Sequence, residues 1–405
     1  MSEPSIFAGA RRIASCRSPD TTSVLENEAL AVVDGRIAAV GAESALRDRF
    51  AGATIIDCTN RVITPGFVDS HTHAVFGAWR PHEYAMRSRG APYMEIARQG
   101  GGINSSVRDV RSRSQEELES LTRDRLRGML ELGTTTAEVK SGYGLETEAE
   151  LKMLRVVRTL AAEGPVDLVP TFLGAHEFPS EYRERHDDYV ELLIDEMIPA
   201  VAAEGLAVYC DVFMEPGVYT ADQTRRILEA GLLYGLKPRL HADELEGSGG
   251  AELAAELGAA SADHLGAISD AGIRALARAG TVATLLPATL FFLGRPERAP
   301  ARKLIDAGAT VALATDYNPG SAPSPSMPLV MTMACSSMGM DPFEALHAAT
   351  AGGAAALGLD DGRGTIVEGA PADLIVWDVE DCEEIPYHFG RPPIQSVWKR
   401  GRRVR

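Results

Sequence analysis

The sequence has few cysteines, and their spacing excludes both a disulfide framework and a cysteine-based zinc motif. There are five in 405 residues, an odd number, and no two of them form a Cys-x-x-Cys pair. Secreted domains that depend on disulfides carry cysteines at much higher density. We therefore expect thiols that stay reduced, as in the cytoplasm. The five are Cys16, Cys58, Cys210, Cys335 and Cys382.

Long apolar runs are also missing. No stretch reaches the roughly 18 to 20 uninterrupted apolar residues of a membrane-spanning helix. The first residues lack a basic region followed by an apolar core, so we expect no signal peptide. Apolar residues make up 45% of the chain, as in an ordinary globular protein. The sequence therefore predicts a soluble protein without a membrane partner.

Positive charge is scarce relative to negative charge. Lysine and arginine number 40 against 57 aspartates and glutamates, which gives a formal net charge of −17. Such a balance argues against nucleic acid or an anionic membrane as the main partner. It leaves room for a small anionic substrate if a few arginines are placed locally.

The middle of the chain alternates strand-like and helix-like segments. Eight strand-like runs, most of them followed by a helix, are typical of a (β/α)8 barrel. An open, doubly wound sheet is the alternative, but no Gly-x-Gly-x-x-Gly follows the first run. The strand-like runs lie near 66–70, 134–139, 167–173, 207–213, 237–241, 259–263, 281–286 and 310–315. The helix-like segments include 116–131, 148–162, 188–204, 220–234, 250–257 and 270–279.

Both ends of the chain differ from the middle and read as short strands. Asp34-Gly35 separates two β-like runs, which is a strong hairpin signal. The last forty residues have a similar pattern. We therefore predict an α/β protein with two domains: a small β-sandwich built from residues 1–62 and 363–405, and a barrel of residues 63–362.

A short motif after the first predicted barrel strand suggests metal chemistry. Pro65 and Gly66 open an apolar run that ends in His71-Thr72-His73. Alternate residues of an extended strand share a face, so the two imidazoles can point the same way. An isolated His-x-His is more often a surface or packing pair, but here suitable side chains also follow other predicted strands, at the end where barrel enzymes place their reactive groups. They are His176, His241, His264 and Asp316.

Part of this set fits a hydrolytic metal site. Three imidazoles and one carboxylate are ligands that catalytic metal ions such as zinc and iron accept. They would come from His71, His73, His241 and Asp316. The fourth predicted strand ends without a lysine that could bridge two metals, and we interpret Lys140, after the second strand, as a salt-bridge lysine. We therefore predict one divalent ion per subunit, zinc or iron, in a hydrolase.

Longer motifs extend over essentially the whole chain and narrow this interpretation. They occupy residues 71–80, 83–87, 93–97, 100–103, 140–144, 172–177, 241–244 and 315–321. The His-x-His start, histidines on the fifth and sixth strands and an aspartate on the eighth resemble the amidohydrolase superfamily. The longer motifs resemble one family within it, the imidazolonepropionases.

The resemblance implies that the chain opens the lactam ring of 4-imidazolone-5-propanoate with water. The product would be N-formimidoyl-L-glutamate, in the third step of L-histidine degradation. Arg80 would hold the propanoate through two parallel N–H bonds. Proton transfer and carbonyl polarisation would be divided among Glu244, His264 and Asp316, in a way that the sequence leaves open. The residues expected to contact substrate are Arg80, Tyr143, His176, Glu244, Asn318, Gly320 and Ser321.

Two other functions stay open at this point. Another amidohydrolase, such as a deaminase or chlorohydrolase acting on a nitrogen heterocycle, would share the metal ligands but lack an anchor such as Arg80. An inactive barrel serving as a scaffold would usually have lost ligands, whereas this sequence keeps all of them. Base rates favour a homodimer. Residues 100–102, three glycines, could form the hinge of a lid over the pocket.

Overall fold

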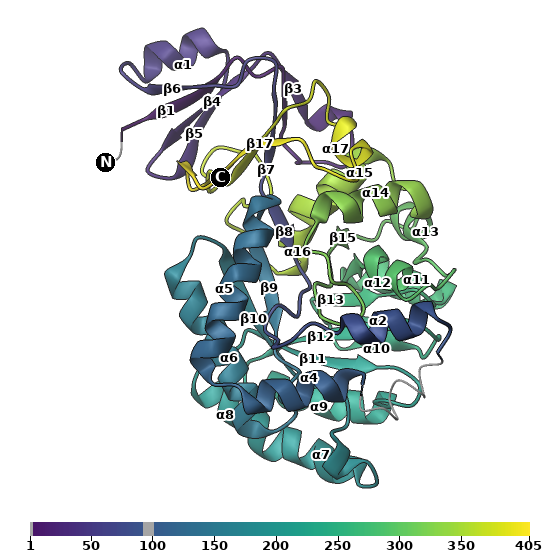
Figure 1. Cartoon of the computed structure of the whole chain (residues 1–405). Coiled ribbons are helices and arrows are strands. Elements are labelled where there is room, and N and C mark those ends of the chain that lie inside the picture. Colours follow the sequence, from purple (N-terminus) through teal and green to yellow (C-terminus); the bar gives the residue numbers. More distant parts are fainter. Residues whose placement is uncertain (1–2, 92–100) are drawn as a thin grey trace.

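The computed structural model describes residues 3–91 and 101–405. In this part of the chain the largest sheet has eight strands in sequence order, each parallel to its neighbour (Figure 1). All eight coincide with predicted strand-like runs. They are β8 (Phe67–Asp69), β9 (Thr134–Lys140), β10 (Asp167–Ala175), β11 (Tyr209–Met214), β12 (Lys237–Ala242), β13 (Ser261–His264), β14 (Val282–Leu285) and β15 (Val311–Leu313).

The first and last strands of this sheet meet and close it into a barrel. An isolated parallel bridge joins Thr72, just beyond β8, to Tyr317, just beyond β15. There the amide of His73 donates to the carbonyl of Tyr317 at 3.0 Å. The predicted (β/α)8 barrel is therefore confirmed, and its seam passes through the segments that carry three of the four predicted metal ligands, His71, His73 and Asp316.

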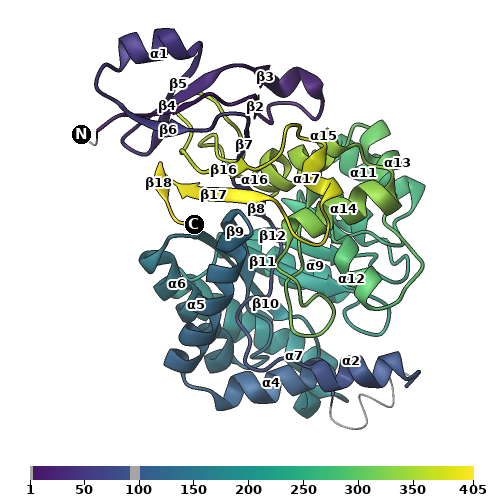
Figure 2. The ribbon, with the colours of Figure 1, turned by 45° about the horizontal axis from the view of Figure 1, so that its top comes forward.

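Helices cover the outside of the barrel (Figures 1 and 2). Two of the longer ones begin at capping boxes, formed by Ser114 with Glu117 and by Thr220 with Gln223. The outer helices are α2 (Pro81–Ser88), α4 (Ile103–Ser112), α5 (Gln115–Glu131), α6 (Thr147–Glu163), α9 (Ala221–Leu233), α10 (Gly250–Glu256), α11 (Asp270–Ala279), α12 (Pro287–Phe292), α13 (Ala301–Asp306), α14 (Met327–Met338), α15 (Pro342–His347) and α16 (Gly353–Ala356). None of the described helices is both long and apolar enough to cross a membrane.

The helix predicted over residues 188–204 is not continuous. The structure has α7 (His186–Leu192) and α8 (Ile198–Ala203), joined by a wider π-type turn, Leu193–Met197. Pro199 lies in the first turn of α8 and has no N–H to donate to the preceding turn. The apolar periodicity of the segment continues through the wide turn, which is why the sequence pattern reads as one helix.

Strands from both ends of the chain form two further sheets beside the barrel (Figure 2). The predicted hairpin at Asp34-Gly35 is confirmed. One sheet contains β5 (Arg36–Gly41), β4 (Ala29–Val33), β1 (Ser5–Ala8) and β6 (Thr54–Asp57), with α1 (Glu43–Arg49) packed on it. The other contains β18 (Arg402–Arg403), β17 (Ile394–Lys399), β16 (Leu374–Trp377), β7 (Val62–Pro65), β2 (Arg12–Ala14) and β3 (Val24–Glu26), with α17 (Glu384–Tyr387) in the loop before β17.

The division into two domains stays a prediction. The boundary expected after residue 62 falls inside β7, which pairs with the C-terminal strand β16. The next strand along the chain, β8, already belongs to the barrel. The two units therefore follow one another without a linker at this point.

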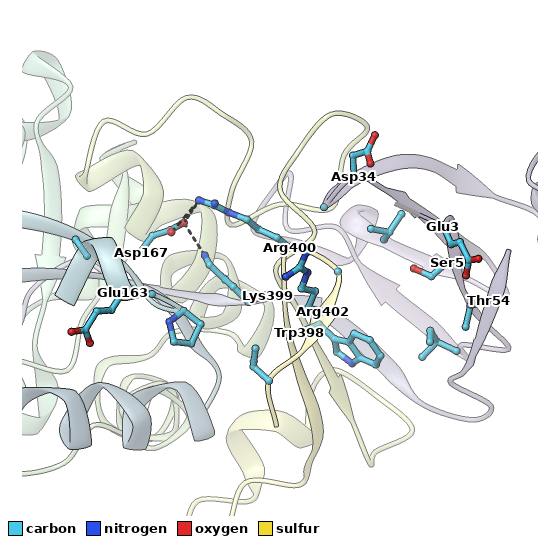
Figure 3. A pocket seen from close by; sticks show the side chains of 18 of the residues that line it. Glu3, Ser5, Asp34, Thr54, Glu163, Asp167, Trp398, Lys399, Arg400 and Arg402 are labelled. Carbon is cyan, nitrogen blue, oxygen red and sulfur yellow. Dashed lines mark hydrogen bonds and ion pairs between the residues drawn. The ribbon is translucent and has the colours of Figure 1, made fainter. Parts of the chain in front are cut away.

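A partly exposed ion-pair cluster joins the terminal sheet to the amino end of the barrel strands. Asp167, at the start of β10, accepts from Lys399 at 2.8 Å and from Arg400 at 3.1 Å (Figure 3). It also accepts from Arg363 at 3.1 Å. A hollow of about 1060 Å³ lies beside this cluster, and none of the predicted site residues lines it. The junction is therefore structural, and the chemistry is concentrated at the other end of the barrel strands.

Candidate active site

The predicted ligands and catalytic residues gather at the carboxyl end of the barrel, each at or near the end of a strand. The ring centroids of His71 and His241 are 4.5 Å apart, and those of His71 and His73 are 5.3 Å apart. Oδ1 of Asp316 lies 3.6 Å from Nε2 of His71 and 3.4 Å from Nε2 of His73. Four side chains from three separate stretches of the sequence thus come close together in the interior, with His71 between the others.

Backbone bonds across the barrel seam set the position of Asp316. Its amide donates to the carbonyl of His71 at 3.0 Å. The preceding residue, Thr315, donates from its amide and its hydroxyl to the buried carboxylate of Asp69, at 3.0 and 2.6 Å. Asp316 also has a left-handed backbone, with φ of 52°, as does His264, with φ of 79°. Non-glycine residues held in this region are costly and concentrate at functional sites.

Several imidazole nitrogens at this point are buried and have no hydrogen-bond partner among residues 3–91 and 101–405. They are Nε2 of His71, His241 and His264, together with Nδ1 of His73. Buried polar atoms are normally paired, so an orphaned cluster indicates a missing ligand. Two overlapping triads have ligand atoms within 4.8 Å of one another: His71, His73 and Asp316, and His71, His241 and His264. Imidazole and carboxylate donors in this arrangement fit a divalent transition metal.

Two buried carboxylates orient the metal-facing imidazoles. Nδ1 of His71 lies 2.7 Å from Asp263, and Nδ1 of His241 lies 3.1 Å from Asp211. A carboxylate at Nδ1 holds the proton there and leaves the Nε2 lone pair free toward the site. The sequence analysis missed both aspartates. Their only signal was a charged residue inside a buried strand, and in the case of Asp263 its position next to His264.

The same carboxylates are neutralised by two buried cations below the site. Lys140 lies 2.7 Å from Asp211 and 2.8 Å from Glu138, and Arg239 lies 3.0 Å from Asp263. Burial disfavours the charged ammonium, but the neighbouring carboxylates outweigh burial and raise the pKa of Lys140. The interpretation of Lys140 as a salt-bridge lysine is confirmed.

A cavity of about 220 Å³ opens above the cluster, and Arg80 is among the residues that line it. Within the described part of the chain, Nε and Nη1 of Arg80 are buried without a hydrogen-bond partner, and the guanidinium forms one long ion pair, 3.7 Å from Nε to the carboxylate of Glu83. A guanidinium whose N–H donors lack acceptors can bind an anion. The cavity lining includes every residue that the sequence predicted to contact substrate: Arg80, Tyr143, His176, Glu244, Asn318, Gly320 and Ser321.

The turn after Asp316 shapes this pocket through its backbone. The side-chain oxygen of Asn318 accepts from the amides of Gly320 and Ser321, both at 2.8 Å, and its NH2 donates to the carbonyl of Asp316 at 2.7 Å. The Asn318 amide is therefore used inside the turn. Gly320 lies directly against Arg80, so close that any side chain there would overlap the guanidinium.

His176 and Tyr143 form one wall of the pocket. The His176 ring stacks on His73 at 4.9 Å and lies 5.4 Å from the Tyr143 ring. Its Nδ1 contacts the carbonyl of Gly142 at 2.9 Å. Burial, followed by the neighbouring His241, lowers the pKa of His176 to about 3. His176 is therefore neutral, donates from Nδ1 to the carbonyl and presents Nε2 as an acceptor.

Glu244 faces His264 across the pocket. Its carboxylate lies 3.6 Å from Nδ1 of His264. Burial, followed by the nearby Asp316 and Glu215, raises the pKa of Glu244 to about 8. Glu215 also accepts from the amides of Glu244 and the next two residues, at 2.7 to 3.2 Å, and so fixes the loop that carries Glu244.

Some of the residues that the sequence analysis singled out lie outside the described part of the chain. The motif at 93–97 and Gly100 lie outside the described residues. Gly102, at the start of α4, donates its amide to Glu83 at 3.0 Å. The hinge and lid expected at residues 100–102 stay a prediction.

Comparison with known proteins identifies the family of this chain. Residues 62–404 match the amidohydrolase family. A curated imidazolonepropionase from Geobacillus sp. (strain WCH70) is 49% identical over 385 residues, which cover 94% of this chain and 91% of that protein. One from Symbiobacterium thermophilum is 50% identical over 386 residues, with the same coverage.

Solved structures show the same fold at lower identity. A 5-methylcytosine deaminase from Klebsiella pneumoniae, liganded with 5-fluorocytosine, superposes with a TM-score of 0.77 at 21% identity, over 99% of this chain and 97% of that one. An adenosine deaminase from Xanthomonas campestris with bound zinc gives 0.72 at 21% identity, over 98% and 92%. The match over most of the chain and the high identity to the curated relatives show that this protein belongs to the amidohydrolase family and, within it, to the imidazolonepropionases.

Proposed function

We propose that this protein hydrolyses the lactam C–N bond of 4-imidazolone-5-propanoate to give N-formimidoyl-L-glutamate, the third step of L-histidine degradation. The observation that carries the proposal is the Arg80 guanidinium, which lines the same small cavity as the imidazole and carboxylate cluster and has two buried nitrogens without a hydrogen-bond partner among the described residues. A ring substrate with a propanoate tail would need both features. The curated relatives, named imidazolonepropionases, support the same assignment.

In this proposal Arg80 binds the propanoate through two parallel N–H bonds. Nε2 of neutral His176 accepts a hydrogen bond from a ring N–H, and Tyr143 packs beside the ring. Gly320 and Ser321 complete the pocket, and Asn318 acts by holding their turn in shape. The purine and pyrimidine deaminases that share the fold are named for substrates without a carboxylate tail, so an anchor such as Arg80 favours the imidazolone.

We assign one divalent metal ion, zinc or iron, to His71, His73, His241 and Asp316. A metal ion in such a site supplies Lewis acidity and makes water more acidic near neutral pH. His264 then lies beside the ligands, where its orphaned Nε2 can polarise the ring carbonyl. His264 also lies close to His71 and His241, so its imidazole is an alternative nitrogen ligand for the ion.

Proton transfer falls to Glu244 and Asp316. Water adds its hydroxyl group to the ring carbonyl carbon, and the lactam C–N bond then breaks. Asp316 takes the proton of the water, and Glu244 delivers a proton to the departing ring nitrogen. The raised pKa of Glu244 suits the second role, because the group carries a proton at neutral pH.

The test is to mix purified protein with imidazolone propanoate and to follow the loss of ring absorbance, with and without a chelator. Elemental analysis of the same sample measures the metal and its stoichiometry. Turnover that the chelator abolishes and one added metal ion restores supports the proposal. A metal-loaded protein that releases ammonia from a nitrogen heterocycle and leaves imidazolone propanoate intact would assign it to a deaminase instead.

The sequence-based expectations of a cytoplasmic location and a homodimer are kept as part of this proposal. All five cysteines have free thiols, four of them buried, which supports a reducing compartment. Light scattering on the purified protein tests the dimer.

A further inference from the structure

The loop between β9 and α6 carries Tyr143 into the pocket, and one buried carboxylate holds its amides. Glu150, in the first turns of α6, is fully buried. Its carboxylate accepts from the amide of Gly142 at 2.9 Å, of Gly144 at 2.7 Å and of Leu145 at 2.9 Å. Three amide donors on the two sides of Tyr143 therefore converge on one side chain.

The carbonyls of the same residues are also bound by side chains. Arg111, on α4, donates to the carbonyl of Gly144 at 2.7 Å and to that of Leu145 at 2.9 Å. The carbonyl of Gly142 accepts from Nδ1 of His176. The loop thus has almost no hydrogen bonds of a regular element, and its shape depends on Glu150, Arg111 and His176.

Neither glycine of this loop can be replaced by a stiffer residue. Gly142 has φ of +104°, and a Cβ there would lie 2.9 Å from Nδ1 of His176. A Cβ at Gly144 would lie 2.6 Å from the backbone nitrogen of Glu150. Glycine has the largest backbone entropy to lose on ordering, so a Gly-Tyr-Gly segment needs external bonds to keep one conformation.

The environment of Glu150 is unusual for a residue that only caps a helix. Among the described residues, no lysine, arginine or histidine forms an ion pair with its carboxylate. A hydroxyl at the cap position of α6 would satisfy a helix end at lower cost than a buried charge. The carboxylate reaches back over the loop instead, and the residues that it fixes are those that form the substrate wall.

We propose that Glu150 is a positioning residue for substrate binding: by holding the amides of Gly142, Gly144 and Leu145 it fixes the Tyr143 ring and, through the Gly142 carbonyl, the orientation of His176. The inference rests on the proposed function, because Tyr143 and His176 are assigned there to the substrate. Glu150 itself touches no reacting atom. Its loss should weaken substrate binding and leave the chemical step and the metal ligands in place.

The first experiment compares Glu150→Gln with Glu148→Gln in steady-state turnover of imidazolone propanoate. Glutamine keeps the shape of Glu150 but replaces one acceptor oxygen by an NH2 group that opposes the loop amides. We expect KM to rise at least about tenfold, with kcat within about twofold and metal content unchanged. Glu148 lies two residues away, is 80% exposed and pairs only at the surface with Arg155, so its variant should match the parent. A fall in kcat at constant KM would overturn the inference, because a merely structural role lowers the fraction of active enzyme.

A second experiment does not depend on turnover. Hydrogen exchange of peptides that cover residues 141–146 should be at least about tenfold faster in E150Q than in the parent protein. It should be moderately faster in Arg111→Gln, because that variant loses the hydrogen bonds of the partly exposed Arg111 to the carbonyls of Gly144 and Leu145. Unchanged exchange at 141–146 in both variants would overturn the inference. If the parent protein does not consume imidazolone propanoate, the proposed function fails, whereas the exchange data still decide whether Glu150 fixes the loop.

Discussion

Because Gly320 lies against Arg80, a substitution at Gly320 can displace the guanidinium that would bind the substrate carboxylate, without replacing the arginine itself. In Gly320→Ala, the new Cβ would lie 1.3 Å from Nη2 of Arg80 and 2.4 Å from its Cζ. Ordinary contact requires about 3.4 Å, so the end of the guanidinium must move by about 2 Å. Gly320 does not have a positive φ, so alanine adds no backbone strain there. The perturbation therefore falls on the position of Arg80.

The size of the effect follows from the bonds that Arg80 would make. A hydrogen bond to a charged group contributes about 1.5 to 3 kcal/mol, and a displacement of this size removes at least one of the two bonds to a carboxylate. The expected rise in KM is therefore about 10- to 150-fold. The anchor is remote from the bond that breaks, so kcat and metal content should change little. Arg80→Ala should raise KM by at least as much.

A double-mutant cycle on the absorbance assay separates this mechanism from general damage. If alanine acts by displacing the guanidinium, adding Gly320→Ala to Arg80→Ala should raise KM hardly any further. Gly128→Ala is a matched control, because Gly128 lies in α5 and a Cβ there meets nothing within 4 Å. An equal rise in KM in both backgrounds, or a loss of kcat at constant KM, would refute the reasoning.

Four further predictions follow from other contacts. Asp263→Asn should weaken metal binding about 10- to 100-fold in competition with a chelator, because the amide no longer holds the His71 proton as a carboxylate does. Glu244→Gln should lower kcat by about 10²- to 10⁴-fold at unchanged metal content, as measured by turnover and elemental analysis. Asp167→Asn should lower the free energy of unfolding in urea by about 1 kcal/mol and leave kcat unchanged, since it loosens only the junction of the sheets. Burial lowers the pKa of His347, so the unfolded state binds a proton more readily than the folded state. The free energy of unfolding should therefore fall as the pH drops through about 6.5. Urea titrations at pH 7 and 5.5 should show a smaller fall in His347→Gln than in the parent protein.

The barrel and the cluster of ligands could be predicted because both depend on short-range patterns. Apolar runs separated by helices give parallel strands, and parallel strands place their carboxyl ends at one edge. His71, His241 and Asp316 follow such runs directly. Their convergence therefore needs no knowledge of register, only of strand direction.

The support beneath the site could not be predicted, because it depends on register between strands. Lys140 meets Asp211 only because β9, β10 and β11 are aligned so that both side chains point to the barrel axis at the same height. Glu150 likewise has the appearance of a charge on an amphipathic helix. Its contact with the Tyr143 loop depends on a tight turn into α6 that the Gly-Tyr-Gly sequence permits but does not specify.

The buried charges below the imidazoles explain how a cation can be held inside the barrel. The network of paired groups contains two cations, Lys140 and Arg239, and three carboxylates, Glu138, Asp211 and Asp263. Its excess is one negative charge, directly beneath His71 and His241. In a low-dielectric interior that excess would be costly unless a positive charge lay above it. The Nδ1 contacts of His71 and His241 link the aspartates to the site, so the network and a divalent ion would stabilise each other.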